Sequence, residues 1–467
     1  MTKLNGWKSA LAVLLLCAAT AMVTHAQVFT TLVVFDDYDG NLPNMSFTQG
    51  RDGNLYGTTF VGAGARQNGT LFRMTFAGDL RESLPLPGST GASKPLAGLV
   101  QGLDRNFYGT TYWGGQYNFG TIFKVDSTGA ITVLHSFCAF ENCFDGGGPW
   151  APLIQATDGN LYGTTSFGTI FRVTPSGEFT NLYTFNNAGL YDALVEGTDG
   201  NLYGTTGGYD SYGVETIFKL TLAGNLTTLY TFPGEPGPEG GLIQATDGNF
   251  YGTTIYGGTN GKGSAYKITP TGTLTTLYMF CAQPSCSDGS YPYAGLVQGT
   301  DSNFYGTTRE GGTHQECSGG CGTIFKLTPQ GVLTTLHAFR LAEGVAPESG
   351  LYQATNGIFY GATPYAGNLK CPRQRGGCGT IYSLDVGLGP FVTFVRFAGR
   401  VGRTGPILGQ GLTGTTSVSI NGIQANFTVV TDTLIRATVP PGATTGYVSV
   451  TTPSGTLTSS VPFHVIP

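Results

Sequence analysis

Gly241 to Phe280 reads G-L-I-Q-A-T-D-G-N-F-Y-G-T-T, then a glycine-rich loop, then S-A-Y-K-I-T-P-T-G-T-L-T-T-L-Y-M-F. Its four short segments, rich in Thr, Tyr and apolar residues, are separated by turn signals, which is typical of strands joined as hairpins. The dipeptide Tyr-Gly marks versions of this unit at Tyr56, Tyr108, Tyr162, Tyr203, Tyr251, Tyr305 and Tyr360. Seven such units, spaced 41 to 55 residues apart, predict a β-propeller built from four-stranded blades.

Each unit is expected to contain strands A to D, arranged as an antiparallel meander. In the third unit these strands are expected at residues 153–155, 161–165, 169–173 and 179–185. The turns Asp158-Gly159-Asn160 and Pro175-Ser176-Gly177 supply the positive and preset φ angles that tight hairpins require. In such a meander the A–B and C–D turns lie at one end of the sheet, and the B–C and D–A loops lie at the other.

The two ends of the repeat region complement each other. The seventh unit stops after strand C at residues 380–384, and a matching strand D, F-T-T-L-V-V-F, stands at residues 29–35. A ring whose last blade takes its outer strand from the N-terminus exposes no edge, whereas an open solenoid has no reason to split a repeat in this way. We therefore expect an all-β fold with a seven-bladed β-propeller over residues 27–388, closed by the N-terminal strand.

Residues 1–26 are typical of a secretory signal peptide. Lys3 and Lys8 form a basic start before an apolar run from Ala10 to Val23, and Ala26 is a small residue at the expected cleavage site. The apolar run is short for a membrane anchor, and no second run follows it. We expect no transmembrane segment in the mature chain and a protein that is secreted or on a bacterial cell surface, with the periplasm as a third location.

Composition and cysteine spacing exclude several kinds of site. Only 11% of the 467 residues are charged and the net charge is −5, so no nucleic-acid partner is expected. Eight cysteines remain after removal of Cys17, and their local pairing is typical of disulfides in an exported protein. The pairs are Cys138/Cys143, Cys281/Cys286, Cys317/Cys321 and Cys371/Cys378. Zinc is the alternative, but it normally requires C-x-x-C pairs and nearby histidines, so neither a metal nor a cofactor is predicted.

The B–C and D–A loops contain almost all of the length variation, all eight mature cysteines and both mature tryptophans. Variable loops on a rigid scaffold are the usual place for binding. The aromatic candidates for ligand binding are Trp113, Trp150, Tyr112, Tyr117, Tyr209, Tyr256 and Tyr293. The alternative is that these rings only cover the gaps between blades.

One polar position recurs in strand A, the strand that lines the channel of a propeller. It is occupied by Gln49, Gln101, Gln155, Glu196, Gln244, Gln298 and Gln353. These side chains could form a polar ring around the channel, or they could bind the backbone of the neighbouring blade; we favour the second interpretation. Glu196, the one charged member, is the candidate for binding a ligand or ion if the ring interpretation holds.

Catalytic signals are weak. His135 and His337 occupy a strand D position that is tyrosine in other units, so we interpret them as wall residues between blades. There is no recognisable Ser/His/Asp set or G-x-S-x-G motif. The recurring Asp-Gly-Asn is interpreted as a turn and not as a calcium loop, because each copy offers few oxygen ligands.

A polysaccharide-cleaving enzyme would need two acidic residues that converge near the mouth of the channel. The loop acids available for such a pair are Glu141, Asp145, Glu310 and Glu316.

From Pro390 the repeat gives way to a stretch rich in Val, Thr and Gly. Its alternating segments predict a small immunoglobulin-like β-sandwich over residues 389–467. The expected strands are residues 416–420, 425–430, 434–439, 446–451 and 461–465. Asn421-Gly422 predicts a hairpin between the first two of them.

The repeat G-L-I-Q-A-T-D-G-N-F-Y-G-T-T … G-T-I-F-K-L-T-P-x-G-x-L-T-T-L-Y-x-F covers about residues 28–386 and resembles the GloVer tandem repeat, named for Gloeobacter and Verrucomicrobia. This resemblance implies an exported bacterial surface or secreted protein. The tail from Gly411 to Gly455 is similar to the IPT/TIG immunoglobulin-like module. In bacterial exported proteins that resemblance implies a spacer or adhesion element and not a catalyst.

We therefore expect an exported, non-catalytic binding or adhesion protein. The loop face of its propeller would recognise a carbohydrate or another extracellular ligand, so an extracellular glycan or a surface protein is the expected partner. Two alternatives stay open: a propeller enzyme acting on an extracellular polysaccharide or lactone, and a structural protein of the cell envelope.

Overall fold

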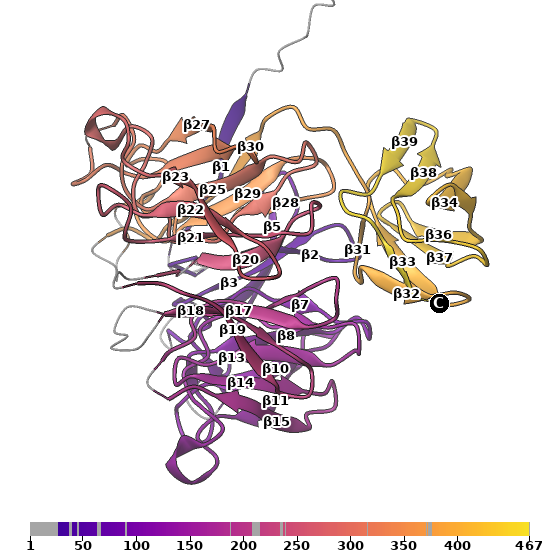
Figure 1. The fold of residues 1–467 in the computed structure, drawn as a ribbon, viewed down its shortest axis with the longest axis horizontal. Coiled ribbons are helices and arrows are strands. Elements are labelled where there is room, and N and C mark those ends of the chain that lie inside the picture. Colours follow the sequence, from indigo (N-terminus) through magenta and orange to yellow (C-terminus); the bar gives the residue numbers. More distant parts are fainter. Residues whose placement is uncertain are drawn as a thin grey trace, which may run out of the picture.

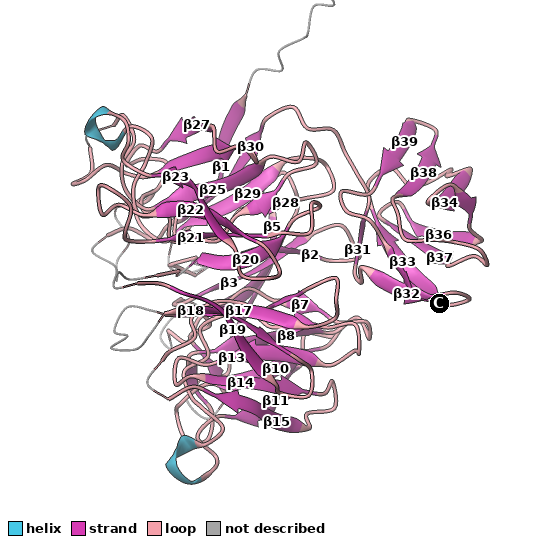
Figure 2. Ribbon diagram, in the orientation of Figure 1, coloured by secondary structure: helices cyan, strands magenta, loops and turns pink. Residues whose placement is uncertain are grey.

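The structure is a computed structural model that describes residues 27–36, 40–43, 46–62, 67–88, 91–186, 188–207, 215–233, 237–238, 240–314, 316–369, 371 and 376–466. The predicted signal peptide, residues 1–26, lies outside the described residues. Figure 2 shows strands throughout, with short helical turns such as η2 (Glu141–Cys143) and η3 (Pro284–Cys286) at the periphery. In the described ranges no helix has the length and apolar character that crossing a membrane requires.

The repeat region consists of four-stranded antiparallel sheets, of which the described residues contain seven. We number them 1 to 7 in chain order. Sheet 1 contains β2 (Thr48–Gln49), β3 (Leu55–Thr59), β4 (Thr70–Met74) and β5 (Leu80–Pro85). Sheet 2 contains β7 (Val100–Gln101), β8 (Phe107–Thr111), β10 (Thr121–Val125) and β11 (Ile131–Ser136). Sheet 3 contains β12 (Ile154–Gln155), β13 (Leu161–Thr164), β14 (Thr169–Val173) and β15 (Phe179–Thr184).

The next three sheets repeat this order. Sheet 4 contains β16 (Val195–Glu196), β17 (Leu202–Thr206), β18 (Thr216–Leu220) and β19 (Leu226–Thr231). Sheet 5 contains β20 (Gly240–Gln244), β21 (Phe250–Thr254), β22 (Ser264–Ile268) and β23 (Leu274–Met279). Sheet 6 contains β24 (Val297–Gln298), β25 (Phe304–Thr308), β26 (Thr323–Leu327) and β27 (Leu333–Ala338). A separate small ribbon pairs β6 (Ala92–Ser93) with β9 (Trp113–Gly114).

Sheet 7 joins the two ends of the repeat region. It contains β28 (Tyr352–Gln353), β29 (Phe359–Thr363), β30 (Thr380–Asp385) and β1 (Val28–Val34). The N-terminal β1 runs antiparallel to β30, with Phe29 opposite Leu384, and Figure 1 shows the indigo strand beside the orange one. The pairing that the sequence predicted between residues 29–35 and 380–384 is therefore present.

The Tyr-Gly dipeptide is explained by packing within each sheet. A Cβ atom on Gly306 would lie 2.6 Å from Cζ of Phe325 on the next strand and 3.0 Å from Cδ2 of Leu296. The glycine is therefore required because an aromatic ring of strand C lies directly over it. The preceding tyrosine has a different role: the hydroxyl of Tyr305 donates a hydrogen bond of 2.9 Å to Asp301 in the Asp-x-Asn turn.

The same tyrosine–aspartate bond recurs in sheets 1 to 6. In sheet 3 the carboxylate of Asp158 also accepts hydrogen bonds from the backbone N–H and the side-chain amide of Asn160. The aspartate oxygens are thus used within the turn, which confirms the turn interpretation of Asp-Gly-Asn. Among the described residues no group of three or more His, Cys, Asp or Glu side chains could hold a metal ion.

The recurring strand A glutamines link each sheet to the one before it. Oε1 of Gln101 accepts the backbone N–H of Arg51, two residues after Gln49, at 3.0 Å. The same bond forms from sheet to sheet at 2.8–3.1 Å, and it returns to the start where Gln49 accepts the N–H of Thr355. These seven hydrogen bonds form a circuit that passes through all seven sheets. The interpretation that these side chains bind the neighbouring backbone is confirmed.

The C-terminal residues form two facing four-stranded sheets. One contains β31 (Thr393–Phe394), β33 (Thr404–Leu408), β37 (Leu434–Thr438) and β36 (Phe427–Thr431), and the other contains β35 (Ile423–Gln424), β34 (Ser417–Ile420), β38 (Val448–Thr452) and β39 (Gly455–Thr458). A further pair, β32 (Ala398–Arg400) and β40 (His464–Ile466), is parallel. A single buried apolar cluster, which includes Ile407, Val418, Ile435 and Val450, fills the space between the sheets.

One predicted hairpin of this region differs. Asn421-Gly422 does form a tight turn, but it joins β34 to the two-residue β35. The segment predicted as the partner, residues 425–430, instead provides β36, which pairs with β37 in the opposite sheet. The chain crosses between the sheets at Ala425, which is buried, so the hairpin ends after two residues.

This C-terminal unit lies against the turn end of the repeat sheets, beside β2 in Figure 1. Thr433 donates a hydrogen bond of 3.0 Å from its hydroxyl to the backbone carbonyl of Arg51, and the side-chain amide of Gln410 donates one of 3.0 Å to the hydroxyl of Thr355. Arg51 and Thr355 belong to the hydrogen-bond circuit, so the C-terminal unit contacts sheets 1 and 7 at the end that carries this circuit.

Candidate functional site

A cavity of about 760 Å³ lies at the opposite end of strand A, where the loops gather. Two recurring positions build it. Each of the seven units contributes the residue three places before its strand A glutamine or glutamate, which we call the circuit residue. These residues are Ser46, Gly98, Pro152, Ala193, Gly241, Gly295 and Gly350. Because these residues are small and come from every sheet, they leave an open space where the sheets meet. Three extended residues span about 10 Å, so the cavity and the circuit lie at different depths along the segments that lead into strand A.

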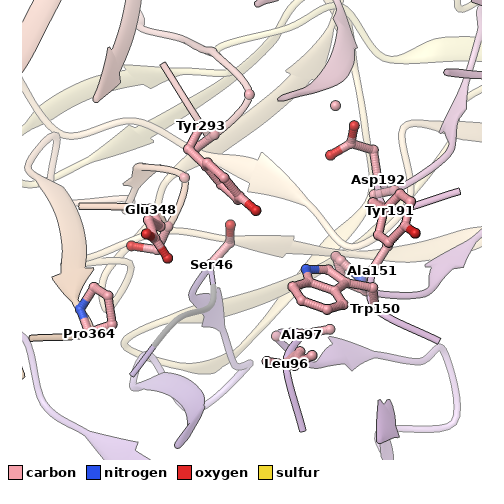
Figure 3. Close-up of a pocket in the computed structure, with 18 of the residues that line it drawn as sticks. Ser46, Leu96, Ala97, Trp150, Ala151, Tyr191, Asp192, Tyr293, Glu348 and Pro364 are labelled. Carbon is pink, nitrogen blue, oxygen red and sulfur yellow. The ribbon is translucent and has the colours of Figure 1, made fainter. Parts of the chain in front are cut away.

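The second recurring position lies five places before the circuit residue and contributes larger side chains, several of them aromatic and one of them acidic. Its described members, Leu96, Trp150, Tyr191, Tyr293 and Glu348, all line the cavity (Figure 3). The corresponding residues of sheets 1 and 5, Asn44 and Glu239, lie outside the described residues.

The backbone between these two positions is fixed by hydrogen bonds from the adjacent sheet. The hydroxyl of Thr110 on β8 donates to the carbonyl of Ala151 at 3.0 Å, and the hydroxyl of Thr253 on β21 donates to the carbonyl of Ala294 at 3.0 Å. Equivalent bonds anchor three further segments. The segments that face the cavity precede strand A and are held to the neighbouring sheet by these hydrogen bonds, which favours a preformed site.

Aromatic rings form a continuous wall on one side of the cavity. Tyr112 contacts Trp113 and Trp150 edge to face, with ring centroids 5.0 and 5.4 Å apart, and Trp150 contacts Tyr191 in the same way at 5.8 Å. Tyr293 faces this wall from across the cavity in Figure 3. Aromatic rings offer apolar area, and the tyrosine hydroxyls add polar edges, so the wall suits a ligand with both apolar and hydroxylated surfaces.

Three charged side chains line the same space. Nε of Arg309 lies 3.1 Å from Oε1 of Glu348, forming an ion pair. Burial raises the pKa of the Glu348 carboxyl, and the positive charge of Arg309 acts against this rise. Asp192, which accepts a hydrogen bond of 3.3 Å from the hydroxyl of Thr205, lies on the opposite side of the cavity in Figure 3.

Asp192 and Glu348 were not among the loop acids that the sequence predicted as a possible catalytic pair. Of those, Asp145 is buried and accepts hydrogen bonds from the backbone N–H of Ala139 and from the ring of His135. Glu316 accepts the backbone N–H of Leu341. Neither these two nor Glu141 and Glu310 line the central cavity. Glu348 could have been found from its place five residues before Gln353, whereas Asp192, four residues before Glu196, belongs to neither recurring position.

The predicted aromatic residues divide into two groups. Tyr112, Trp113, Trp150 and Tyr293 line the cavity. Tyr117 and Tyr256 are exposed but do not line it, and Tyr256 packs edge-on against Tyr291 at 5.6 Å. Tyr209 lies outside the described residues.

Glu196 lies in the hydrogen-bond circuit and does not line the cavity. Its carboxylate accepts the backbone N–H of Thr157 at 2.8 Å and the Thr157 hydroxyl at 2.6 Å. Burial raises the pKa of Glu196 despite these hydrogen bonds, which act in the opposite direction. In the structure Glu196 therefore has the same linking role as the glutamines.

Each of four loops at this end is closed by a local disulfide: Cys138–Cys143, Cys281–Cys286, Cys317–Cys321 and Cys371–Cys378. The two histidines of strand D lie between sheets, as expected. His135 stacks on Phe179 of sheet 3 with centroids 4.0 Å apart, and His337 stacks on Phe29 of sheet 7 at 3.8 Å. Neither histidine lines the cavity.

Several solved structures are similar to this chain. A virginiamycin B lyase from Staphylococcus aureus shares 16% identity with a TM-score of 0.54, and the match covers 77% of this chain and 99% of the lyase. The histidine-to-alanine variant of that lyase, catalytically inactive and in complex with quinupristin, shares 15% identity with a TM-score of 0.53, covering 77% of this chain and 99% of that one. The extracellular domain of the system BT4673 from B. thetaiotaomicron shares 12% identity with a TM-score of 0.50, covering 95% of this chain and 59% of that one. At such identities these likenesses describe the fold alone, which is propeller-like.

No curated protein is significantly similar to the chain in sequence. The profile described as Gloeobacter/Verrucomicrobia repeat matches residues 19–192 and 190–428, and the IPT/TIG domain profile matches residues 396–465. The repeat profile therefore spans most of the chain, in agreement with the recurring sheets and their shared packing. The protein belongs to the Gloeobacter/Verrucomicrobia repeat family and carries a C-terminal IPT/TIG domain.

Proposed function

We propose that the protein is an exported binding protein whose central cavity holds a carbohydrate. The observation that carries this proposal is how the side chains at the second recurring position, five places before each circuit residue, are arranged around the cavity. There Trp150, Tyr191 and Tyr293 face a common space that also contains the Arg309–Glu348 ion pair. A sugar ring has an apolar face that packs on aromatic rings and hydroxyl groups that bond to carboxylates and guanidinium groups.

The proposed architecture places this site on the axis of a ring. We propose that sheets 1 to 7 are the blades of a closed seven-bladed propeller over residues 27–388, and that residues 389–467 form a separate immunoglobulin-like domain. The hydrogen-bond circuit and the pairing of β1 with β30 support closure. Such a ring is a rigid frame for a binding site at its centre.

Export and secretion also belong to the proposal. Residues 1–26 would be the removed signal peptide, and the mature protein would be secreted or remain at the bacterial cell surface. Four disulfides in one chain support this location, because disulfides persist in oxidising compartments.

A catalytic role is the alternative, since two of the similar structures are lyases. A histidine is needed for activity in that lyase, because its alanine variant is catalytically inactive. Among the residues that line the cavity here there is no histidine, which favours binding over a lyase reaction of the same kind. Among the described residues, the acids that a glycosidase could use there are Asp192 and Glu348, which lie on opposite sides of the cavity in Figure 3.

The test is a glycan and polysaccharide binding screen of the mature chain, repeated with Trp150→Ala and Tyr293→Ala. Each variant removes an aromatic contact of the cavity, and we expect a loss in affinity of about tenfold or more. Tyr256→Ala is the matched control, because this exposed ring lies outside the cavity.

Unchanged circular dichroism would show that the variants fold. If the unaltered protein bound no glycan, the carbohydrate proposal would fail, and a protein partner or a structural role would replace it. Release of new reducing ends from a bound polysaccharide, lost in Glu348→Gln, would instead establish the enzymatic alternative.

A further inference from the structure

A second pocket of about 350 Å³ lies beside the central cavity, among the loops of sheets 6 and 7. Arg309 and Tyr365 line both spaces, so these two side chains form the boundary between them. Arg309 directly follows β25, and Tyr365 follows β29 by two residues. The two spaces are thus neighbours that share these two side chains.

The walls of the second pocket are held by covalent and hydrogen bonds. The disulfide Cys317–Cys321 closes one side, and the carbonyl of Cys321 accepts the backbone N–H of Ala346 at 3.1 Å from the opposite side. Tyr365 is fixed by an isolated β-bridge to Val345. Walls that are already ordered do not have to be ordered on binding, which favours affinity at this pocket.

The lining of the second pocket is mixed in character. Leu341, Val345 and Ala346 supply apolar surface, while Glu310 and Arg309 supply charged groups at its edge. This combination repeats that of the central cavity, where aromatic surface is combined with the Arg309–Glu348 pair. A ligand whose units share one chemistry, apolar on the faces and hydroxylated at the edges, would suit both spaces.

From this adjacency and the shared side chains we propose that the ligand is a β-linked oligosaccharide chain, one part of which occupies the central cavity while the next part passes Arg309 and Tyr365 into the second pocket. Equatorial linkages keep such a chain flat, so that each unit presents an apolar face to a wall. The inference rests on the proposed carbohydrate function and adds a second subsite and a chain-shaped ligand to it. A single compact sugar would use the central cavity only.

The test is calorimetric titration of the full mature chain with β-1,4-linked glucose and N-acetylglucosamine oligomers of increasing length, starting from the single sugar. We expect affinity to rise about tenfold or more when the oligomer is long enough to enter the second pocket, and then to stay constant. Ser318→Trp places a large ring into this pocket from an exposed position, so the core is left intact. Ser318→Ala is its matched control.

Ser318→Trp should bind the single sugar as the unaltered protein does and lose the gain with length, whereas Ser318→Ala should keep that gain. If single sugars and long oligomers bound equally well, or if the gain survived in Ser318→Trp, the second subsite would be refuted while the central site would stand. If neither series bound at any length, the chain-shaped ligand would be refuted together with the carbohydrate function from which it follows.

Discussion

Replacing Glu196 by glutamine should stabilise the protein at neutral pH. Glu196 is the one carboxylate in a circuit that is otherwise made of glutamines. In the equivalent position of sheet 3, Gln155 does more than accept a hydrogen bond: its Nε2 also donates one of 2.9 Å to the carbonyl of Gly159. Gln244 makes the same contact to Gly248 at 3.0 Å. An ionised glutamate has no donor for this second bond.

The expected magnitude follows from that missing bond. Glu196→Gln would let the new amide donate to the carbonyl of Gly200, which corresponds to Gly159, and one additional hydrogen bond contributes about 0.5–1.5 kcal/mol to the free energy of unfolding. The mutation also removes a half-buried charge. Burial dominates over the hydrogen bonds from Thr157, because the pKa of Glu196 is raised and not lowered. The neutral amide is therefore expected to be the better partner, by about 1 kcal/mol.

The gain should depend on pH in a definite direction. Because the pKa of Glu196 is higher in the folded state, folding is linked to proton uptake between the unfolded and folded pKa values. The wild type therefore loses stability as pH rises through this window, which begins near the unfolded glutamate value of about 4.3. Glutamine does not titrate, so the advantage of Glu196→Gln should be smallest in acid and largest at neutral pH.

Urea denaturation of both proteins across this pH range measures the difference. Gln298→Glu is the matched reverse change, because Gln298 accepts the N–H of Thr246 at 2.9 Å and donates to the carbonyl of Ser302 at 3.3 Å. It should destabilise the protein at neutral pH and recover in acid. Lower stability of Glu196→Gln at neutral pH would refute the reasoning, and would mean that the attraction between Glu196 and Arg396 of the C-terminal unit outweighs burial.

Two further predictions concern the repeat motif. Gly306→Ala should lower the free energy of unfolding by about 1–3 kcal/mol, since its methyl group would overlap the ring of Phe325. Gly405→Ala, which has open space around it, should leave the free energy of unfolding unchanged. Urea denaturation checks both. Burial opposes ionisation of Asp199, but its hydrogen bonds, one of them from Lys219, outweigh burial and lower the pKa of Asp199 to about 2. The stability that ionised Asp199 contributes is therefore complete above about pH 4 and is lost as the pH falls toward 2. Lys219→Met should raise that pKa, measured by NMR titration, and an unchanged value would show that the other hydrogen bonds are sufficient.

Much of the fold could be predicted because its determinants are local and repeated. Turn residues such as Asp158-Gly159-Asn160 mark each hairpin, and the orphan strand at residues 29–35 identifies its partner by sequence alone. The circuit could also be anticipated, because a polar residue in an otherwise apolar strand requires a hydrogen-bond partner. The turn and the polar strand A position recur with the same or a closely similar residue in most units, and such repetition is visible without coordinates.

The cavity could be predicted only in part, because its residues share a position and not a chemistry. Leu96, Trp150 and Glu348 are equivalent in the structure, yet nothing in their side chains relates them. Aromatic content led to Trp150 and Tyr293 but also to Tyr256, which lies outside the cavity. Which rings converge depends on how the ends of separate sheets meet, and this is a long-range property.

The pairing of β1 with β30 affects how the protein unfolds. In an open array of repeats the terminal unit has a single neighbour, so unfolding can begin there and proceed stepwise, as in a one-dimensional Ising chain. Here the first and last segments of the repeat region share sheet 7, and the hydrogen-bond circuit returns from Thr355 to Gln49. In the closed ring that we propose, every unit has two neighbours, and none is predisposed to fray. Such a molecule should lose its repeats together, and a circular permutant that joined residue 28 to residue 385 would move the termini without creating an end.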